Sequence, residues 1–183
     1  MSSPYHTILA AVALTCVSTL YAQNPPAPPQ PGPAQAKLAF FAGRWTSDAE
    51  MKPGPMGPGG KMTGTDTCEW FAGGFHVVCR GEGHSPMGDM KNLGILGYDS
   101  ERQRYTYYGI DNSGMGSGDM AYGQVSGDTW NWEGESMMGG KPVKFRYTVK
   151  QLSPDSYSFQ LDMSMDGGPW ATSMMGTETR LKP

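Results

Sequence analysis

Two segments in the C-terminal third of the chain alternate strictly between apolar and polar residues. The odd positions of residues 143–149 hold Val, Phe, Tyr and Val, and those of residues 157–165 hold Tyr, Phe, Leu, Met and Met. A period of two predicts strands with one face in a core and the other in water. Ser153-Pro154-Asp155 lies between the segments and suits a turn, so we predict an antiparallel hairpin.

A second hairpin is predicted around Gly73-Gly74, because two glycines between apolar runs are a strong signal for a tight turn. Cys68 and Cys79 lie at equal distances from this turn. They are therefore expected to face each other on paired strands, within reach of a disulfide. An oxidising compartment favours that bond, and we predict a Cys68–Cys79 disulfide.

The sequence after Gly43 consists of short β-like runs between Gly, Pro, Asp and Asn turns, and glycine is abundant with 26 residues. The pattern predicts one short helix, at residues 35–41. Many short strands joined by tight turns indicate either a sandwich or an up-and-down barrel. Closure leaves no exposed strand edges. We therefore predict an all-β, antiparallel up-and-down barrel of about nine or ten strands, with the short helix before the first strand.

The N-terminal region carries no Asp, Glu, Lys or Arg before Lys37. Its apolar run at residues 8–20 is too short for a membrane-spanning helix, which needs about 20 apolar residues, and has the length of a signal-peptide core. We predict a signal peptide at residues 1–22, a proline-rich spacer at residues 23–35 and one folded domain at residues 36–183. The mature protein is then periplasmic or secreted, with no membrane attachment.

The net charge of −3 is spread along the 183 residues without blocks of one sign. Binding to nucleic acid needs basic side chains that neutralise phosphates, and binding to a membrane surface commonly uses a basic amphipathic helix. The sequence shows neither feature, so we expect no nucleic-acid or membrane partner.

The start of the first predicted strand, Gly43-Arg44-Trp45, resembles the Gly-x-Trp signature of lipocalin and calycin barrels. In that superfamily the tryptophan lies at the closed end of the barrel, and a basic residue of the last strand packs against it. Arg180 has the position for that role, and a guanidinium stacked on an indole is a favourable contact. The resemblance implies that Gly43, Trp45 and Arg180 are structural residues of a lipocalin-like barrel.

The chain also resembles the bacterial family known as domain of unknown function 1579. The resemblance covers most of residues 38–182. It is carried by Gly43-Arg44-Trp45, the Met/Gly/Pro loop at residues 51–59, the Gly73-Gly74 turn, residues 96–99 and the ending at residues 174–180. The cysteine pair is a departure, because we do not associate it with the family as a whole. The family implies a lipocalin-like barrel and supplies no activity.

Aromatic residues are the first candidates for a binding site. The alternation of the predicted strands places many of them on inward faces, where they form either an apolar cup for a small molecule or a core that fills the barrel. The candidates for contact with a ligand are Trp70, Tyr105, Tyr107, Trp130, Trp132, Tyr147 and Phe159. We predict an exported barrel that binds an apolar or amphiphilic small molecule, and keep a structural domain with a filled core as an alternative.

Methionine provides a second alternative, because the chain has 14 Met residues and many of them precede a glycine. Thioethers are soft ligands that suit Cu(I). His84, Met87 and Met90 form the best local cluster of candidate copper ligands. Methionine also serves as an adaptable filler of cores and loops, so the main prediction includes no metal and no other cofactor.

Catalytic motifs are not found: the sequence lacks Gly-x-Ser-x-Gly, His-Glu-x-x-His and a phosphate-binding loop. Carboxylates are scattered over the predicted strands, among them Asp66, Glu69, Glu82, Asp111, Glu133 and Glu135. Alternating charges on strands usually mark the face in water, so no carboxylate is assigned a catalytic role. We predict that the protein is not an enzyme.

Overall fold

The computed structural model describes residues 27–114, 118 and 120–182. The predicted signal peptide at residues 1–22 and the start of the predicted spacer lie outside the described residues. A short helix, α1 (Pro33–Ala36), and a 3-10 helix, η1 (Lys37–Phe40), precede the first strand. The strands are β1 (Gly43–Met51), β2 (Gly60–Trp70), β3 (Val77–Ser85), β4 (Gly88–Asp99), β5 (Arg104–Asp111), β6 (Met120–Ser126), β7 (Thr129–Met138), β8 (Lys141–Ser153), β9 (Ser156–Met165) and β10 (Ala171–Arg180).

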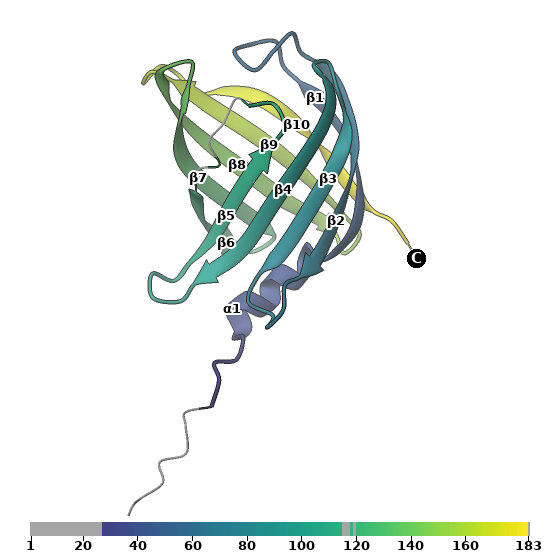
Figure 1. The fold of residues 1–183 in the computed structure, drawn as a ribbon, viewed down its shortest axis with the longest axis vertical. Coiled ribbons are helices and arrows are strands. Elements are labelled where there is room, and N and C mark those ends of the chain that lie inside the picture. Colours follow the sequence, from purple (N-terminus) through teal and green to yellow (C-terminus); the bar gives the residue numbers. More distant parts are fainter. Residues whose placement is uncertain (1–26, 115–117, 119, 183) are drawn as a thin grey trace, which may run out of the picture.

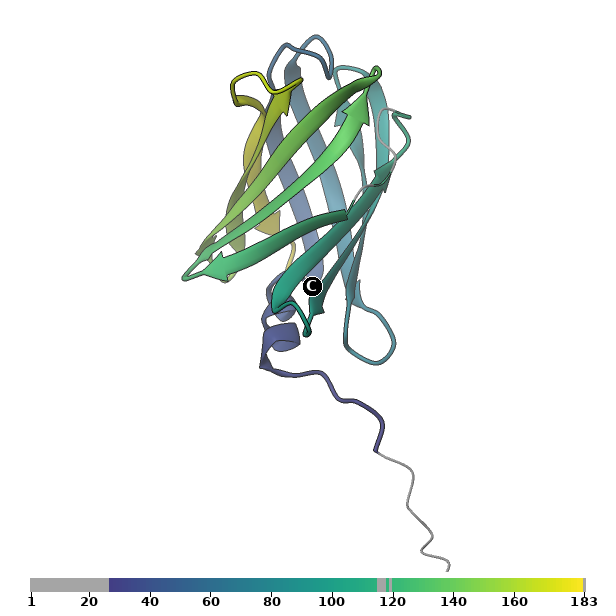
Figure 2. The same cartoon turned by 90° about the vertical axis from the view of Figure 1, so that its left-hand side faces the viewer.

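Each strand pairs antiparallel with the next one along the chain, and β10 pairs with β1, so the strands form a closed barrel. Figure 1 shows the strands tilted around the barrel, with α1 at one end. The same helix lies below the strands after a quarter turn (Figure 2). We call the end that carries α1 the base, and the opposite end the far end. The predicted all-β, up-and-down barrel is confirmed.

The helix before the first strand begins earlier than the predicted residues 35–41. It starts at Pro33, inside the stretch predicted as a spacer. Proline suits the first helical position, because its φ is already helical and its missing N–H would have had no partner there. The Gln35 side chain accepts a hydrogen bond from the Gly32 N–H (3.0 Å), which caps the start of the helix, and Gln35 is itself buried. Within the described residues, no helix is both long and apolar enough to cross a membrane.

The hairpin around Gly73-Gly74 has the predicted register. Cys68 of β2 lies directly opposite Cys79 of β3, and the two form a disulfide. The turn glycines have positive φ values, 93° at Gly73 and 75° at Gly74, which residues with a side chain rarely adopt. The predicted Cys68–Cys79 bond is confirmed, and the backbone explains why two glycines form the turn.

The two strictly alternating segments form β8 and β9. They pair with each other, with Val143 opposite Met165 and Val149 opposite Phe159. Val143, Val149 and Phe159 are almost completely buried. The apolar faces of both strands therefore point into the barrel, as the alternation predicts.

Candidate functional site

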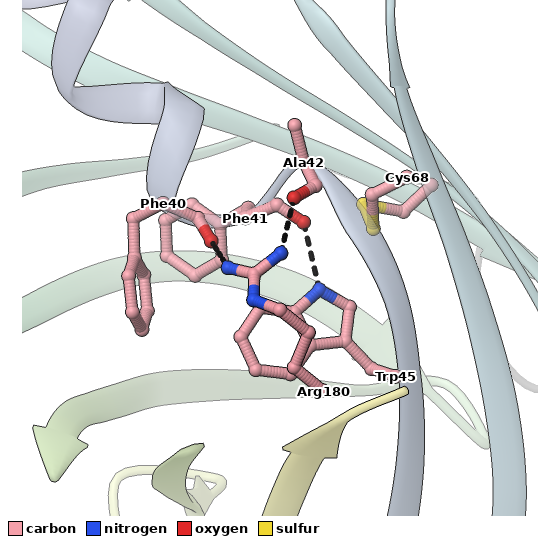
Figure 3. Close-up of a disulfide and its surroundings, with 7 residues drawn as sticks. Phe40, Phe41, Ala42, Trp45, Cys68 and Arg180 are labelled. Atoms are coloured by element: carbon pink, nitrogen blue, oxygen red, sulfur yellow. Dashed lines mark hydrogen bonds between the residues drawn. A yellow bond between two sulfur atoms is a disulfide. The ribbon is translucent and has the colours of Figure 1, made fainter. Parts of the chain in front are cut away.

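The base of the barrel is sealed by Trp45 and Arg180, as the resemblance to calycin barrels implies. The two residues pair on β1 and β10, and the guanidinium carbon lies 4.1 Å from the centre of the indole ring. Arg180 donates hydrogen bonds to the carbonyl oxygens of Ala42 (2.6 Å) and Phe40 (2.8 Å). Trp45 Nε1 donates to the Phe41 carbonyl oxygen (2.8 Å). Figure 3 shows that these three bonds tie both side chains to the chain segment just before β1.

Gly43 is the third residue that this seal requires. A Cβ atom at Gly43 would collide with Nη1 of Arg180. Its φ of 136° also belongs to the backbone region that favours glycine. The contacts of Gly43, Trp45 and Arg180 therefore agree with the structural roles that the resemblance implies.

Four of the aromatic residues predicted to contact a ligand are almost completely buried: Tyr105, Trp130, Trp132 and Phe159. The first three belong to the packed core next to this seal, whereas Phe159 lies nearer to the far end, beside Tyr147 (ring centres 6.0 Å apart). Trp130 packs edge-on against Phe41 and Tyr105, and stacks on Trp132 with ring centres 5.6 Å apart. The Tyr105 hydroxyl donates to the Ala34 carbonyl oxygen in α1 (3.1 Å). These contacts fill the base and hold the helix against it.

Trp70 does not line the interior, contrary to its predicted place among the ligand-contacting residues. It is the last residue of β2, beyond the disulfide, and 39% of its surface is exposed. Strand alternation gives Trp70 inward parity, but the strand ends at this residue, so the barrel wall does not continue around it.

Two carboxylates, Asp66 and Glu178, face the interior between the base and the far end. Asp66 of β2 lies opposite Trp45, and Glu178 of β10 lies opposite Ser47, so the two acids flank β1. Neither acid forms an ion pair with a described residue. The expectation that such carboxylates mark the face in water is therefore wrong for Asp66, because the register turns it inward.

The two acids ionise at different pH values. Burial raises the pKa of both carboxyl groups. At Glu178 the charge of Asp66 adds to the effect of burial and raises the pKa to about 8, from an ordinary value of 4.5. Asp66 therefore carries the negative charge at neutral pH, while Glu178 is mostly protonated.

Three tyrosines, Tyr107, Tyr147 and Tyr157, lie around these acids. Burial is the main cause that raises the pKa of each phenol, to about 12 for Tyr107, and the charge of Asp66 contributes in all three cases. The phenols therefore stay protonated and can donate hydrogen bonds. Because one charge acts on all three rings, the acids and the phenols share one region. We call these five residues the acid–tyrosine cluster.

Several inward side chains beside the cluster keep accessible surface. Tyr107 and Tyr147 point inward and are surrounded by protein, yet both keep part of their surface accessible, and the inward-facing Asn92 is exposed. Gly94 and Gly109 face each other on β4 and β5, and a Cβ atom on either would lie 3.0 Å from a carbon of the Tyr107 ring. These glycines let the ring lie close to the barrel wall. An inward side chain keeps accessible surface only where the space before it is open, so the cluster borders open space.

Two buried polar atoms near the cluster have no hydrogen-bond partner among the described residues, Oε2 of Glu178 and Nε1 of Trp132. The Trp132 ring centre lies 6.4 Å from that of Tyr147. Buried polar atoms are normally paired, because an unpaired one costs about 1 to 3 kcal/mol. Their position indicates that water or a ligand supplies the missing partners.

The three candidate copper ligands do not meet. His84 faces outward on β3 and pairs with Asp89 (Nδ1 to Oδ1, 3.1 Å), whereas Met90 has the inward parity of β4 and packs against the core. Met87 lies in the turn between these strands, with its sulfur against Gly57. In the part of the chain that the structure describes, no group of three or more His, Cys, Asp or Glu side chains is placed to hold a metal ion.

The methionines nevertheless share one location. Every methionine that the structure describes lies in a loop of the far end or in the half of its strand nearer to that end. Met51 and Met62 are buried there, while the most exposed members are Met87, Met120, Met137 and Met175. The thioether side chain is flexible and polarisable, so the far end has an adaptable apolar rim.

Two hollows on the surface lie away from the cluster. One of about 380 Å³ is at the far end, between β7, β8 and the turn after β9. The other, of about 490 Å³, lies over β2, β3 and β4 beside His84. Neither hollow is lined by a member of the acid–tyrosine cluster or by a buried polar atom without a partner among the described residues. The unpaired buried Oε2 of Glu178 belongs to the acid–tyrosine cluster instead. We therefore place the candidate site at this cluster, inside the barrel.

The sequence predicts two tyrosines of the cluster and misses both acids and the third tyrosine. The missing acids had a usable signal in the alternation of their strands. Asp66 lies two positions before the buried Cys68, and Glu178 lies two positions before the inward-facing Arg180. Side chains two positions apart on a strand share a face, so both acids have inward parity.

Two solved structures have a similar barrel. Rv2717c from M. tuberculosis is 15% identical with a TM-score of 0.60, over 82% of this chain and 99% of that one. The S-type phycobiliprotein lyase CPES from Guillardia theta is 13% identical with a TM-score of 0.55, over 82% of this chain and 93% of that one. At these identities the similarity shows the fold alone. No curated protein matches the chain in sequence.

A family model matches residues 30–180. The matched range contains the sealed base, the disulfide hairpin and the whole acid–tyrosine cluster. It also contains the motifs on which the resemblance was based. The chain belongs to the family described as proteins of unknown function, DUF1579.

Proposed function

We propose that this barrel binds an amphiphilic small molecule in its interior, at the acid–tyrosine cluster. The observation that carries the proposal is the buried Oε2 of Glu178, which has no partner among the described residues. It belongs to a region where inward tyrosines keep accessible surface. An unpaired buried acceptor beside open space is a position that a ligand group can complete. The charge of Asp66 and the phenol donors provide further polar contacts.

The apolar part of the ligand would contact the rest of the inward face. Phe145 and Tyr147 supply flat apolar surface there, and both are only partly buried. The base is closed by α1, Trp45 and Arg180, so the ligand would enter from the far end. The methionine rim at that end can adjust its shape to different apolar groups.

We also propose that the protein works in an oxidising compartment outside the cytoplasm. The Cys68–Cys79 disulfide supports this location, because such bonds form and persist in exported proteins. It agrees with the signal peptide expected at residues 1–22.

That the chain binds its ligand without converting it is likewise a proposal. One observation favours catalysis instead, namely the pKa of Glu178, which burial and Asp66 raise to about 8. A carboxyl group with a pKa near the working pH suits general acid–base chemistry. A substrate would still have to bind at the same place, so binding is the property to test first.

The neutral fluorescent probe N-phenyl-1-naphthylamine tests the proposed site. We expect saturable binding of one probe per chain, seen as a rise in probe emission and quenching of tryptophan emission. Ser47 lies opposite Glu178 on β1 and shares its inward face. Ser47→Phe would place a ring in the open space and weaken probe binding by about tenfold or more.

The matched control is Thr177→Phe, which adds the same ring next to Glu178 but on the exposed outer face of β10. It should bind the probe as the wild type does. Thermal unfolding of both variants confirms that they are folded. The proposal fails if the wild type shows no saturable binding, or if the two variants lose affinity equally.

A further inference from the structure

We propose that the polar group recognised in the barrel is a cation, an organic ammonium held between Asp66 and Glu178. This inference rests on the proposed binding function and names the class of ligand. It is drawn from the charges inside the barrel, the placement of the two acids and the rings around them.

The interior carries a negative charge without a compensating cation. Asp66 has no ion-pair partner among the described residues. On the inward face of the described strands, Lys, Arg and His occur only at strand ends, namely Lys141 at the start of β8 and Arg180 at the end of β10. Lys141 lies at the far end, and Arg180 lies at the base. That guanidinium is engaged at the base, where it lies over Trp45 and 3.4 Å from the Asp155 carboxylate. A buried charge is costly unless it is paired, so a cationic ligand group would stabilise this site.

The two acids are placed to contact one cation from two sides. β2 and β10 flank β1, and Asp66 lies opposite Trp45 while Glu178 lies opposite Ser47. Two strand spacings across and two residues along the strand put the backbones that carry the acids about 12 Å apart. Side chains that point inward from a curved wall converge, and the charge of Asp66 is felt at Glu178. An ammonium group in front of Ser47 has three N–H donors and can bond to oxygens of both carboxyl groups, including the unpaired Oε2 of Glu178.

Aromatic rings complete the surroundings of the cation. Tyr147 and Tyr157 respond to the charges of both acids, and Tyr107 responds to that of Asp66. The face of an aromatic ring attracts a cation, more strongly where water is excluded. The unpaired Nε1 of Trp132 is a donor and would bond to an oxygen atom elsewhere on the same ligand.

Cation binding would release a proton at neutral pH. Glu178 is mostly protonated in the free protein, and a cation beside it favours the ionised form. The carboxyl proton then leaves to solvent, and the ammonium N–H takes its place as the bonded partner. The other titratable or charged groups around Glu178 are Asp66 of β2, Tyr107 of β5, Tyr147 of β8, Tyr157 of β9 and Arg180 of β10. β1 contributes only the uncharged Ser47 and Trp45. Affinity for the cation therefore rises with pH up to about 8.

Three probes with the same ten-carbon chain separate the charge from the apolar part: decylammonium, decanol and decanoate. Isothermal titration calorimetry near neutral pH gives the affinity of each. We expect decylammonium to bind about tenfold or more tightly than decanol, and decanoate to bind more weakly than decanol. Titrations of decylammonium in two buffers with different ionisation enthalpies count the protons, and we expect release of about one proton per ligand.

Two variants and a control assign the effect to residues. Glu178→Gln and Asp66→Asn keep the shapes of the side chains, and each should remove about tenfold of the preference for ammonium over decanol. Glu178→Gln should also abolish proton release, because the variant has no carboxyl proton to lose. Glu82→Gln removes an exposed carboxylate from the outer face of β3 and should change neither the preference nor the proton count.

The outcomes separate this inference from the proposed function. If decanol or decanoate binds as tightly as decylammonium, the inference of a cationic ligand group is wrong. The proposed binding of a small molecule in the barrel is then unaffected. If Glu82→Gln loses the preference as much as the interior variants do, the effect belongs to the net charge of the protein, and the inference is again wrong. If neither these probes nor N-phenyl-1-naphthylamine binds saturably, the proposed function itself is wrong.

Discussion

The base and the acid–tyrosine cluster are adjacent and use the same kinds of side chain, but they differ in whether their polar atoms have hydrogen-bond partners. At the base, Arg180, Trp45 and Tyr105 all donate hydrogen bonds to backbone carbonyl oxygens. In and beside the cluster, Glu178 and Trp132 keep buried polar atoms without a partner among the described residues. The donors of Arg180, Trp45 and Tyr105 are thus paired within the chain, whereas Nε1 of Trp132 and Oε2 of Glu178 are not paired with any described residue. The residues of the base therefore stabilise the fold through their own contacts, whereas the residues of the cluster are positioned by the fold around them.

The largest expected effect comes from breaking the base. Trp45→Ala removes a buried ring, leaves a cavity and takes away the surface on which Arg180 stacks. We expect the free energy of unfolding to fall by about 3 to 5 kcal/mol, measured by urea denaturation. The control Trp170→Ala removes a ring that is 43% exposed and contacts the guanidinium of Arg146. It should cost less than about 1 kcal/mol, and equal losses would contradict the role of the base.

The next effect concerns the cluster, where a substitution is expected to raise the free energy of unfolding instead of lowering it. The pKa of Glu178 is about 8 in the folded protein, against an ordinary value of 4.5. Between these values the folded state keeps a proton that the unfolded state has lost, so stability falls as pH rises through this window. Glu178→Gln removes the penalty and should be about 2 to 4 kcal/mol more stable than the wild type at about pH 9, with little difference at about pH 5.

Thermal unfolding across this pH range measures the difference between Glu178→Gln and the wild type. Glu82→Gln, which changes an exposed carboxylate, serves as the control and should follow the wild type throughout. If the stability difference between Glu178→Gln and the wild type does not grow with pH, the pKa of Glu178 is not raised by the fold. The distinction between the cluster and the base would then lose its main support.

A smaller effect is expected from the disulfide, which lies near the base. Replacing Cys68 and Cys79 together by alanine, or reducing the bond, frees a loop with a sequence separation of 11. A loop of this length predicts a loss of about 2 to 3 kcal/mol. Urea denaturation with and without a phosphine reductant measures it, and the double variant should not respond to the reductant. Probe binding should change little, and a large loss of binding would mean that the hairpin shapes the site.

The smallest effect is expected at the outer surface. His84 and Asp89 form an exposed pair, and such pairs contribute little. His84→Ala should change the free energy of unfolding by less than about 0.5 kcal/mol. It should also leave Cu(I) affinity unchanged in a competition titration with a chromogenic chelator. A tenfold loss of Cu(I) affinity would revive the copper hypothesis for His84, Met87 and Met90.

The parts of the fold that depend on neighbouring residues could be predicted from the sequence. Alternation gave the faces of β8 and β9, and the position of Gly73-Gly74 gave the register that pairs Cys68 with Cys79. Trp70 shows the limit of this reasoning, because parity does not reveal where a strand ends. The sequence predicts a helix from residue 35, two residues too late, because Pro33 belongs to a proline-rich stretch and also suits the first position of a helix.

The candidate site depends on residues that are far apart in the sequence. Asp66 lies on the second strand and Glu178 on the last, and they approach only because β1 pairs with both β2 and β10. Alternation alone states that each acid faces the barrel, but not that both flank one strand. The general rule that charged side chains on strands face water predicts an outward Asp66, and it is wrong for this residue because the register turns Asp66 inward.

The pairing of β1 with β10 also determines how much of the chain must be synthesised before the barrel can form. Arg180 donates a hydrogen bond to Phe40, 140 positions earlier. A chain that is still on the ribosome, or partly threaded through a channel, lacks β10 and exposes the free edges of β1 and β9. Contacts between such distant segments also form slowly. The barrel can therefore close only after the ten residues of β10, Ala171–Arg180, have emerged, and until then the earlier strands remain an open sheet.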